Sequence, residues 1–193
     1  MVTLYAIYGC HGAGKTTLAR NILTADGGEF TEHRNEYGHY TVSKNGNVIA
    51  VGKYSTKCGG ADSLKRAENY YKMLDWLVTK FEDKTVLVEG ILFSEIFTKP
   101  LKSLLHLKYD LGVRVAQVFL YADTPTSLER VEKRSGRAQN LAHIKQKQSV
   151  VSNNIIKYRR LGEFDSVVIN TIGKTEQEVF QEFTKFYNLY RGE

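Results

Sequence analysis

The chain has very little cysteine and proline and no long apolar run. Two of its 193 residues are cysteines, Cys10 and Cys58, and neither belongs to a C-x-x-C pair. Two such cysteines are too few for a disulfide framework or a zinc site, so we expect a reducing compartment and no structural metal. No apolar stretch approaches the roughly 20 residues that cross a membrane, and the N-terminus lacks the charged start of a signal peptide. We therefore expect a cytoplasmic protein with no membrane partner.

Hydrophobic residues are plentiful by comparison, at 42% of the chain. This content and length predict a single domain, residues 1–193, with a real core. The net charge of +6 is concentrated between Arg130 and Arg160, where nine basic residues accompany one acidic residue. Such a block indicates either a polyanionic partner or a solvated helix face that also carries nucleotide-binding arginines. The five histidines are scattered, and we expect them in loops or on the surface rather than as ligands.

The segment Gly9–Thr16, GCHGAGKT, completely fills the phosphate-loop pattern G-x-x-x-x-G-K-[ST]. An apolar run at residues 4–8 predicts a buried strand before it, and residues 17–23 predict a helix after it. Lys15 is expected to reach the β and γ phosphates of a nucleoside triphosphate, and the Thr16 hydroxyl to bind Mg²⁺. The predicted nucleotide-binding residues are Gly9, Gly12, Ala13, Gly14, Lys15, Thr16 and Thr17.

Strand-like and helix-like segments alternate along the rest of the chain. This order is typical of an α/β fold with a doubly wound parallel sheet, for which we expect about five strands. The clearest strands are residues 2–8, 85–89, 113–121 and 165–170, and helices are expected at 62–81, 91–108, 125–134, 141–160 and 175–190. Asn45-Gly46 lies between β-rich flanks and predicts a hairpin. We interpret this hairpin, about residues 37–54, as an insertion outside the parallel core on the substrate side.

Other phosphate-loop proteins fit the sequence less well than a small kinase. The D-x-x-G and N-K-x-D elements of a guanine-nucleotide switch are missing from the sequence. Motor and transporter ATPases usually end a core strand in an Asp-Glu pair, whereas the strand at 85–89 ends in the lone Glu89.

Residues 119–125, followed by 128–137, resemble the nucleoside and nucleotide kinase branch of the phosphate-loop superfamily. In that branch a strand, a helix begun by proline and an arginine-bearing lid occur in this order, and residues 168–171 resemble its loop near the adenine. The resemblance implies ATP as phosphoryl donor and a lid at about residues 130–140. Arginines that arrive with a closing lid stabilise charge on the γ-phosphoryl oxygens, so Arg130, Arg134 and Arg137 are the candidates, unless they are ordinary surface arginines.

Two acids compete for the acceptor side of the predicted site. Glu89 ends a core strand, where open α/β sheets bind ligands, and is a candidate metal ligand or general base unless it forms a structural salt bridge. Asp62 follows Gly59-Gly60 and is a candidate base, with the alternative that it caps the next helix. Glu36 is a weaker third candidate, since phage polynucleotide kinases carry an acid soon after the first helix.

Residues 51–63, with the hairpin before them and the basic block later, resemble phage kinases that phosphorylate 5-hydroxymethyluracil within DNA. The resemblance implies transfer from ATP to the 5-hydroxymethyl oxygen, a DNA partner and a location in the host cytoplasm. Lys145, Lys147, Lys157, Arg159 and Arg160 are then candidates for the DNA backbone.

Tyr37, Tyr40 and Tyr54 are candidates for stacking on an exposed base, unless they only pack the hairpin. The alternatives to a DNA kinase are a small deoxynucleoside monophosphate kinase and a regulatory module that binds ATP without turnover.

Overall fold

The computed structural model describes residues 1–56, 59–64 and 66–191. Within these residues a seven-stranded sheet has the order β2-β3-β4-β5-β1-β6-β7. The strands are β1 (Thr3–Tyr8), β2 (Phe30–Asn35), β3 (Gly38–Ser43), β4 (Val48–Val51), β5 (Thr85–Glu89), β6 (Arg114–Tyr121) and β7 (Asp165–Asn170). The helices are α1 (Lys15–Thr24), the 3₁₀ turn η1 (Ala61–Leu64), α2 (Ala67–Lys80), α3 (Ile91–Glu95), α4 (Thr98–Tyr109), α5 (Thr124–Ser135), α6 (Leu141–Leu161) and α7 (Glu176–Arg191).

The expected doubly wound sheet is present, but it has two more strands than the predicted five or so. Strands β4, β5, β1, β6 and β7 pair in parallel, while β2 and β3 extend the sheet with antiparallel pairs beside β4. The predicted hairpin therefore is not an insertion outside the core. Its second strand, β4, is fully buried, and this short apolar run is typical of a core parallel strand.

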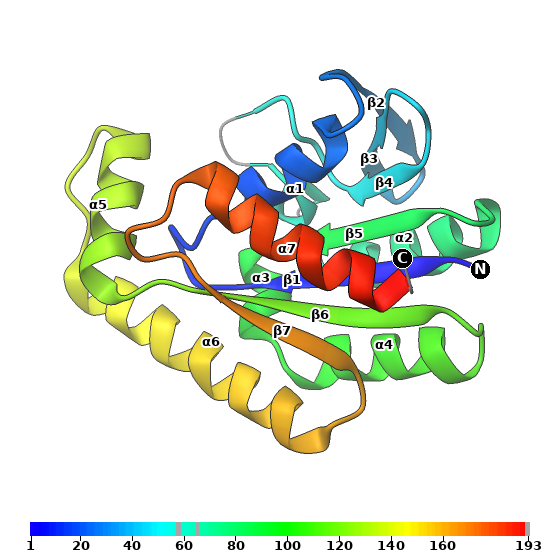
Figure 1. Ribbon diagram of the computed structural model, residues 1–193. Coiled ribbons are helices and arrows are strands. Elements are labelled where there is room, and N and C mark those ends of the chain that lie inside the picture. Colours follow the sequence, from blue (N-terminus) through cyan, green and yellow to red (C-terminus); the bar gives the residue numbers. More distant parts are fainter. Residues whose placement is uncertain (57–58, 65, 192–193) are drawn as a thin grey trace.

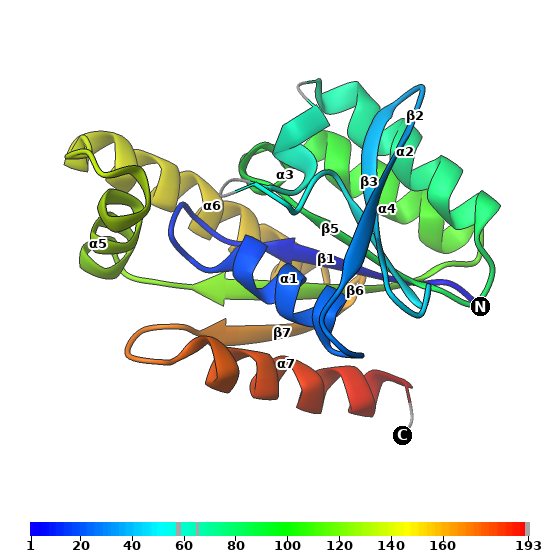
Figure 2. The same ribbon diagram turned by 90° about the horizontal axis from the view of Figure 1, so that it is seen from above.

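Helices cover both faces of the sheet (Figures 1 and 2). On one face, α1 and α7 pack on the side chains of Tyr5, Ile7 and Leu87. On the other face, α2, α3, α4 and α6 pack on Leu4, Ala6 and neighbouring strand residues. Alternate residues of β1 thus point to opposite layers, as the period of a strand requires.

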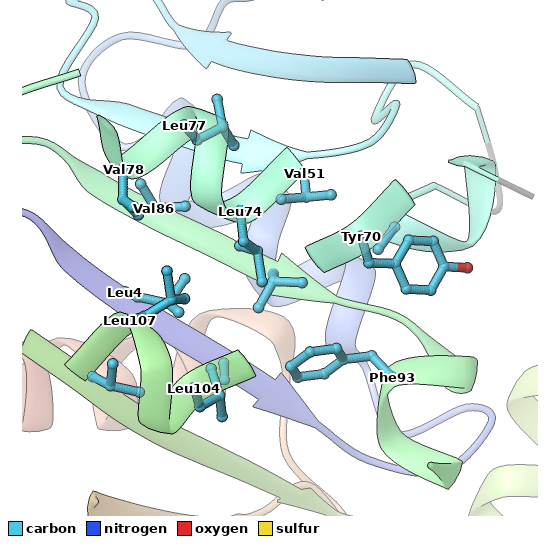
Figure 3. Packing of buried hydrophobic residues seen from close by; sticks show 14 of the residues in the cluster. Leu4, Val51, Tyr70, Leu74, Leu77, Val78, Val86, Phe93, Leu104 and Leu107 are labelled. Carbon is cyan, nitrogen blue, oxygen red and sulfur yellow. The ribbon is translucent and has the colours of Figure 1, made fainter. Parts of the chain in front are cut away.

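Figure 3 shows part of the second layer, in which Leu74 and Leu77 of α2 and Leu104 and Leu107 of α4 lie against Leu4 and Val86 of the sheet. These leucines are 0% exposed. Burying one leucine side chain is worth about 2 kcal/mol, so this layer fixes the strands whose carboxyl ends carry the polar residues described below.

Two helix boundaries differ from the expectation. The region 91–108 divides into α3 and α4, and Pro100 lies in the first turn of α4, where proline is tolerated. The region 62–81 likewise begins as η1 before α2 starts at Ala67. Helix α5 begins as predicted, because Pro125 lies in its first turn and the Asp123 side chain accepts a hydrogen bond from the N–H of Thr126 at 2.9 Å.

In the described part of the chain, none of the helices is both long and apolar enough to cross a membrane. Cys10 is a free, buried thiol, whereas Cys58 lies outside the described residues.

Candidate active site

A cleft of about 620 Å³ lies at the carboxyl ends of the central strands. Small-molecule sites usually have about 300–1,000 Å³, so the cleft is large enough for a nucleotide. Its walls come from the phosphate loop and α1, from η1 and the end of β5, from α5, and from the connection between β7 and α7. The ionisable residues in its lining are His11, Lys15, Arg20, Asp62, Glu89, Arg130, Lys133, Arg134, Lys174 and Glu176.

The phosphate loop turns sharply between β1 and α1. Gly12 has a φ of +73°, and a Cβ at this position would lie 2.7 Å from the carbonyl oxygen of Ser127. Gly14 precedes α1 with a φ of +92° and provides no side-chain cap. The N–H groups at the positive end of α1 are therefore available to an anion in the cleft.

Six of the seven predicted nucleotide-binding residues line the cleft. They are Gly12, Ala13, Gly14, Lys15, Thr16 and Thr17. Gly9 is different, because its N–H donates to the Ser94 hydroxyl at 3.3 Å. Gly9 thus holds the loop against α3 from behind, and a direct contact between Gly9 and a ligand remains a prediction.

Lys15 binds back to the phosphate loop, and Thr16 connects the loop to the acid that ends β5. The Lys15 ammonium donates to the carbonyl oxygens of Gly9 and Cys10, at 2.8 and 3.0 Å. The Thr16 hydroxyl donates to Glu89 Oε1 at 3.0 Å. The hydroxyl and the carboxylate are hard oxygen donors side by side at the mouth of the phosphate loop, and this donor set suits Mg²⁺.

Glu89 is an unusual carboxyl group because it is only 1% exposed. Burial raises the pKa of Glu89 to about 7, although the nearby Lys15 ammonium acts in the opposite direction. No salt bridge to Glu89 occurs among the ion pairs of the described residues. The alternative of a structural salt bridge therefore does not explain this residue.

Asp62 lines the same cleft as the start of α1. Its carboxylate accepts hydrogen bonds from the N–H groups of Ile91 and Leu92, at 2.9 and 3.4 Å. The alternative that Asp62 caps the helix following it is wrong, because Arg66 precedes α2 and Asp62 instead caps α3. This position brings the Asp62 and Glu89 side chains to the same cleft from different elements.

Gly60 makes close contact between these two elements possible. It has a φ of +76°, and a Cβ at Gly60 would lie 2.0 Å from Glu89 Oε1. Any larger residue would collide with the carboxylate. Gly60 thus lets the backbone lie directly against Glu89.

The three predicted lid arginines have different surroundings. Arg130 donates to the carbonyl oxygens of Gly12 and Thr171, at 3.2 and 2.7 Å, and also to the Thr171 hydroxyl. Arg134 is exposed and lines the cleft. Arg137 is exposed beyond Gly136, and the residues that line the cleft do not include it.

Several cleft residues were not predicted from the sequence. His11 lines the cleft, and burial, assisted by the Lys15 charge, lowers its pKa. The sequence could have indicated His11, because it lies inside the phosphate-loop pattern. We instead treated all five histidines alike because they are scattered along the chain. Arg20 could also have been predicted from the sequence, because it lies one helical turn after Thr16. Lys133 and Lys174 carried no comparable sequence signal.

Comparison with known proteins identifies a family. A family model described as 5-hmdU DNA kinase matches residues 1–181. The chain belongs to the 5-hmdU DNA kinase family. Among curated proteins, a 5-hmdU DNA kinase from Bacillus phage SP10 is 29% identical over 170 residues. The match covers 83% of this chain but 26% of the phage protein, so the chain spans about a quarter of the length of this relative.

A solved structure shares the fold of this family member. The YorR protein from Bacillus subtilis, in complex with phosphorylated GDP, superposes with a TM-score of 0.62 at 14% sequence identity. The superposition covers 99% of each chain. At this low identity the likeness shows the fold alone.

The hairpin tyrosines do not form the predicted stacking group. Tyr54 is 1% exposed, so stacking of its ring on a base is excluded in this conformation. Tyr40 packs against Trp76 and is stacked on His33, with ring centroids 5.4 and 5.2 Å apart. Tyr37 packs partly on the core, and Glu36 lies exposed in the turn between β2 and β3, away from the residues that line the cleft.

The basic residues of α6 divide into two groups. Lys147 forms an ion pair with Glu95, and the Lys157 ammonium lies 5.2 Å from the ring centroid of Phe97. Lys145, Arg159 and Arg160 are exposed. Helix geometry places these three within an arc of roughly 100°, so they share one side of a helix about 30 Å long.

Proposed function

We propose that this chain is a kinase that transfers the γ-phosphoryl group of ATP to the 5-hydroxymethyl oxygen of 5-hydroxymethyluracil in DNA. The match of the family over residues 1–181 supports the acceptor. The observation that carries the chemistry is the contact between Thr16 and Glu89, 3.0 Å apart, at the mouth of a complete phosphate loop. Asp62 and Lys15 also line the cleft. They would supply the general base and the phosphate-binding cation that phosphoryl transfer needs.

The phosphate loop is the donor side of this proposal. The N–H groups at the start of α1 hold the phosphates, and Lys15 leaves the carbonyl oxygens of Gly9 and Cys10 to bind the β and γ phosphates. Thr16 and Glu89 would hold Mg²⁺. A bound Mg²⁺ would neutralise charge on the phosphate oxygens.

Asp62 is the proposed general base. The acceptor hydroxyl oxygen forms a bond to the γ phosphorus while the bond from that phosphorus to the β–γ bridging oxygen breaks, and ADP leaves. The hydroxyl proton passes to the Asp62 carboxylate. Asp62 suits this role better than Glu89 because it is exposed in the cleft, whereas Glu89 is buried behind Thr16.

The arginines of α5 have two separate roles in this account. Arg130 joins α5 to the phosphate loop and to Thr171, which positions the donor side. Arg134 is free to stabilise charge on the transferred group. Arg137 contributes only after a movement over the cleft of the lid residues that follow α5.

The test offers several acceptors to the protein with γ-labelled ATP and Mg²⁺. The acceptors are DNA containing 5-hydroxymethyluracil, the same DNA with thymine at that position, DNA with free 5′-hydroxyl ends, and free deoxynucleoside monophosphates. We expect label only on the hydroxymethyluracil DNA. Label on free monophosphates alone would support a nucleotide kinase instead, and no label on any acceptor, with ATP bound, would support a regulatory ATP-binding module.

Lys15→Ala is the control for the donor site. We expect it to reduce transfer by at least about a hundredfold, since it removes the cation that binds the transferred phosphate. Lys102→Ala, which removes an exposed lysine of α4, is the matched control and should retain activity. Wild-type turnover by the Lys15 variant would exclude the phosphate loop from the reaction.

A further inference from the structure

The segment Lys53–Thr56 is held in place by two charged side chains from different elements. It follows β4 and belongs to no named strand or helix. Glu32 of β2 accepts hydrogen bonds from the N–H groups of Tyr54 and Ser55, both at 2.8 Å. From the other side, Arg20 of α1 donates Nε to the Tyr54 carbonyl at 2.9 Å and Nη2 to the Thr56 carbonyl.

The segment forms a single antiparallel bridge, between Lys53 and Gly60, and the contacts with Glu32 and Arg20 take the place of a longer β ladder. Hydrogen bonds with an ionised partner are roughly twice as strong as neutral ones, and here four of them converge on three consecutive residues. Burial alone would raise the pKa of Glu32, but the hydrogen bonds from Ser55 and Tyr54 outweigh it and hold this pKa below its usual value. Glu32 is thus charged at neutral pH and acts as a fixed acceptor.

The segment in turn positions the part of the cleft wall formed by Gly59–Asp62, which we call the acceptor wall. The N–H of Gly60 donates to the Lys53 carbonyl at 2.7 Å, and the Ser63 hydroxyl accepts from the Lys53 N–H at 3.0 Å. The acceptor wall contains Asp62 and lies against Glu89 through Gly60. A shift of Lys53 would therefore move the groups beside the proposed acceptor.

Arg20 also belongs to the helix that holds the donor. It lies one turn after Thr16 on α1, and its side chain lines the cleft. We propose that Arg20 and Glu32 are positioning residues that hold the acceptor wall at a fixed place relative to the phosphate loop and thereby control acceptor binding. This inference rests on the proposed function only in requiring a phosphoryl acceptor beside Asp62.

The first measurement is a steady-state comparison of Arg20→Ala and Glu32→Ala with the wild type. We expect each variant to raise the KM for the acceptor by at least about tenfold, because each removes two charge-assisted hydrogen bonds from the segment. The Kd for ATP, measured with a fluorescent analogue in the absence of acceptor, should change less than about threefold, since the phosphate loop keeps all its own contacts.

Conservative and distant variants are the controls. Glu32→Gln retains an oxygen that accepts from both N–H groups. Its KM for the acceptor should therefore be closer to that of the wild type than to that of Glu32→Ala. Arg34→Ala removes an exposed arginine from the same ribbon and should behave like the wild type. If Glu32→Ala leaves the acceptor KM unchanged, or raises the Kd for ATP as strongly as the acceptor KM, the proposal is overturned.

Hydrogen exchange provides a readout that needs no acceptor. In the proposal, the amides of Tyr54 and Ser55 exchange faster in Glu32→Ala than in the wild type, while the amides of β1 and β5 are unchanged. Uniformly faster exchange across the sheet would mean general destabilisation and would contradict the proposal. If the DNA test fails and a free nucleotide proves to be the acceptor, the same KM comparison with that nucleotide still tests the roles of Arg20 and Glu32. Failure of the proposed function and failure of this inference are therefore distinguishable.

Discussion

Among the individual residues, Glu89 has the environment that differs most from that of an ordinary carboxylate. Its side chain is buried at the end of β5, accepts from Thr16 and lies against the backbone of Gly60. The sequence indicated the position, because an acid at the carboxyl end of an apolar strand is recognisable. Its burial was not predictable, because it depends on Gly60, which comes from a segment almost 30 residues earlier in the sequence.

The raised pKa of Glu89 predicts a pH-dependent cost in stability. Between its usual value of 4.5 and about 7, the folded protein holds a proton on Glu89 that the unfolded chain has released, so the free energy of unfolding falls as pH rises through this range. Each pH unit between the two values is worth about 1.4 kcal/mol, and the full penalty above pH 7 is therefore about 3 kcal/mol.

Glu89→Gln removes this titration. As the pH rises from about 5 to about 8, we expect the variant to gain about 2 to 3 kcal/mol in unfolding free energy relative to the wild type. Denaturant titrations without nucleotide or Mg²⁺ measure it. A difference that is independent of pH would show that Glu89 has an ordinary pKa.

Asp62 combines a structural contact with its proposed chemical role, and two substitutions separate them. Asn retains an oxygen that accepts from the N–H of Ile91, so Asp62→Asn should fold normally but lose about a hundredfold or more in kcat, as expected for loss of a general base. Asp62→Ala should also lose about 1–2 kcal/mol of stability with the cap of α3. An Asn variant with wild-type kcat would remove Asp62 from the proton transfer.

At the scale of elements, the accuracy of sequence-based prediction depended on how local the signal was. The strands at 85–89 and 165–170 have the predicted bounds, because each is a short β-rich run between turns. Strand β2, FTEHRN, was missed because most of its residues are polar and none of them is buried. It exists because β3 pairs with it and because Glu32 holds the segment after β4.

Helix α5 provides a test of which arginines serve structure and which serve transfer. Arg130→Ala should weaken ATP binding and lower the melting temperature, since three hydrogen bonds to the phosphate loop and Thr171 are lost. Arg134→Ala should leave both nearly unchanged and reduce kcat by roughly ten- to a hundredfold. Thermal melting, ATP binding and single-turnover rates measured on both variants would show this division, and the opposite pattern would reverse the two assignments.

At the scale of the whole molecule, the exposed basic residues of α6 are the proposed contact with the DNA backbone. Helix α6 runs from beside α5 to the loop before β7 (Figure 1). Its residues Lys145, Arg159 and Arg160 are exposed. Replacing these three residues by Gln should reduce the slope of log K against log salt for DNA binding by about 2 to 3, because each phosphate contact contributes about 0.9. Replacing the exposed Lys72, Lys80 and Lys102 is the matched control. Equal slopes for the two triple variants would mean that α6 is only a solvated face.

The central claim is that this chain phosphorylates a hydroxyl group on a base inside DNA, and the nucleoside composition of the product tests it most directly. After incubation with ATP and Mg²⁺, DNA containing 5-hydroxymethyluracil is digested with nucleases that leave phosphomonoesters intact and analysed by mass spectrometry. We predict a nucleoside heavier than 5-hydroxymethyldeoxyuridine by one phosphoryl group, absent with Lys15→Ala. A product phosphorylated only at DNA ends, or DNA without added phosphate while free nucleotides are phosphorylated, would contradict the account.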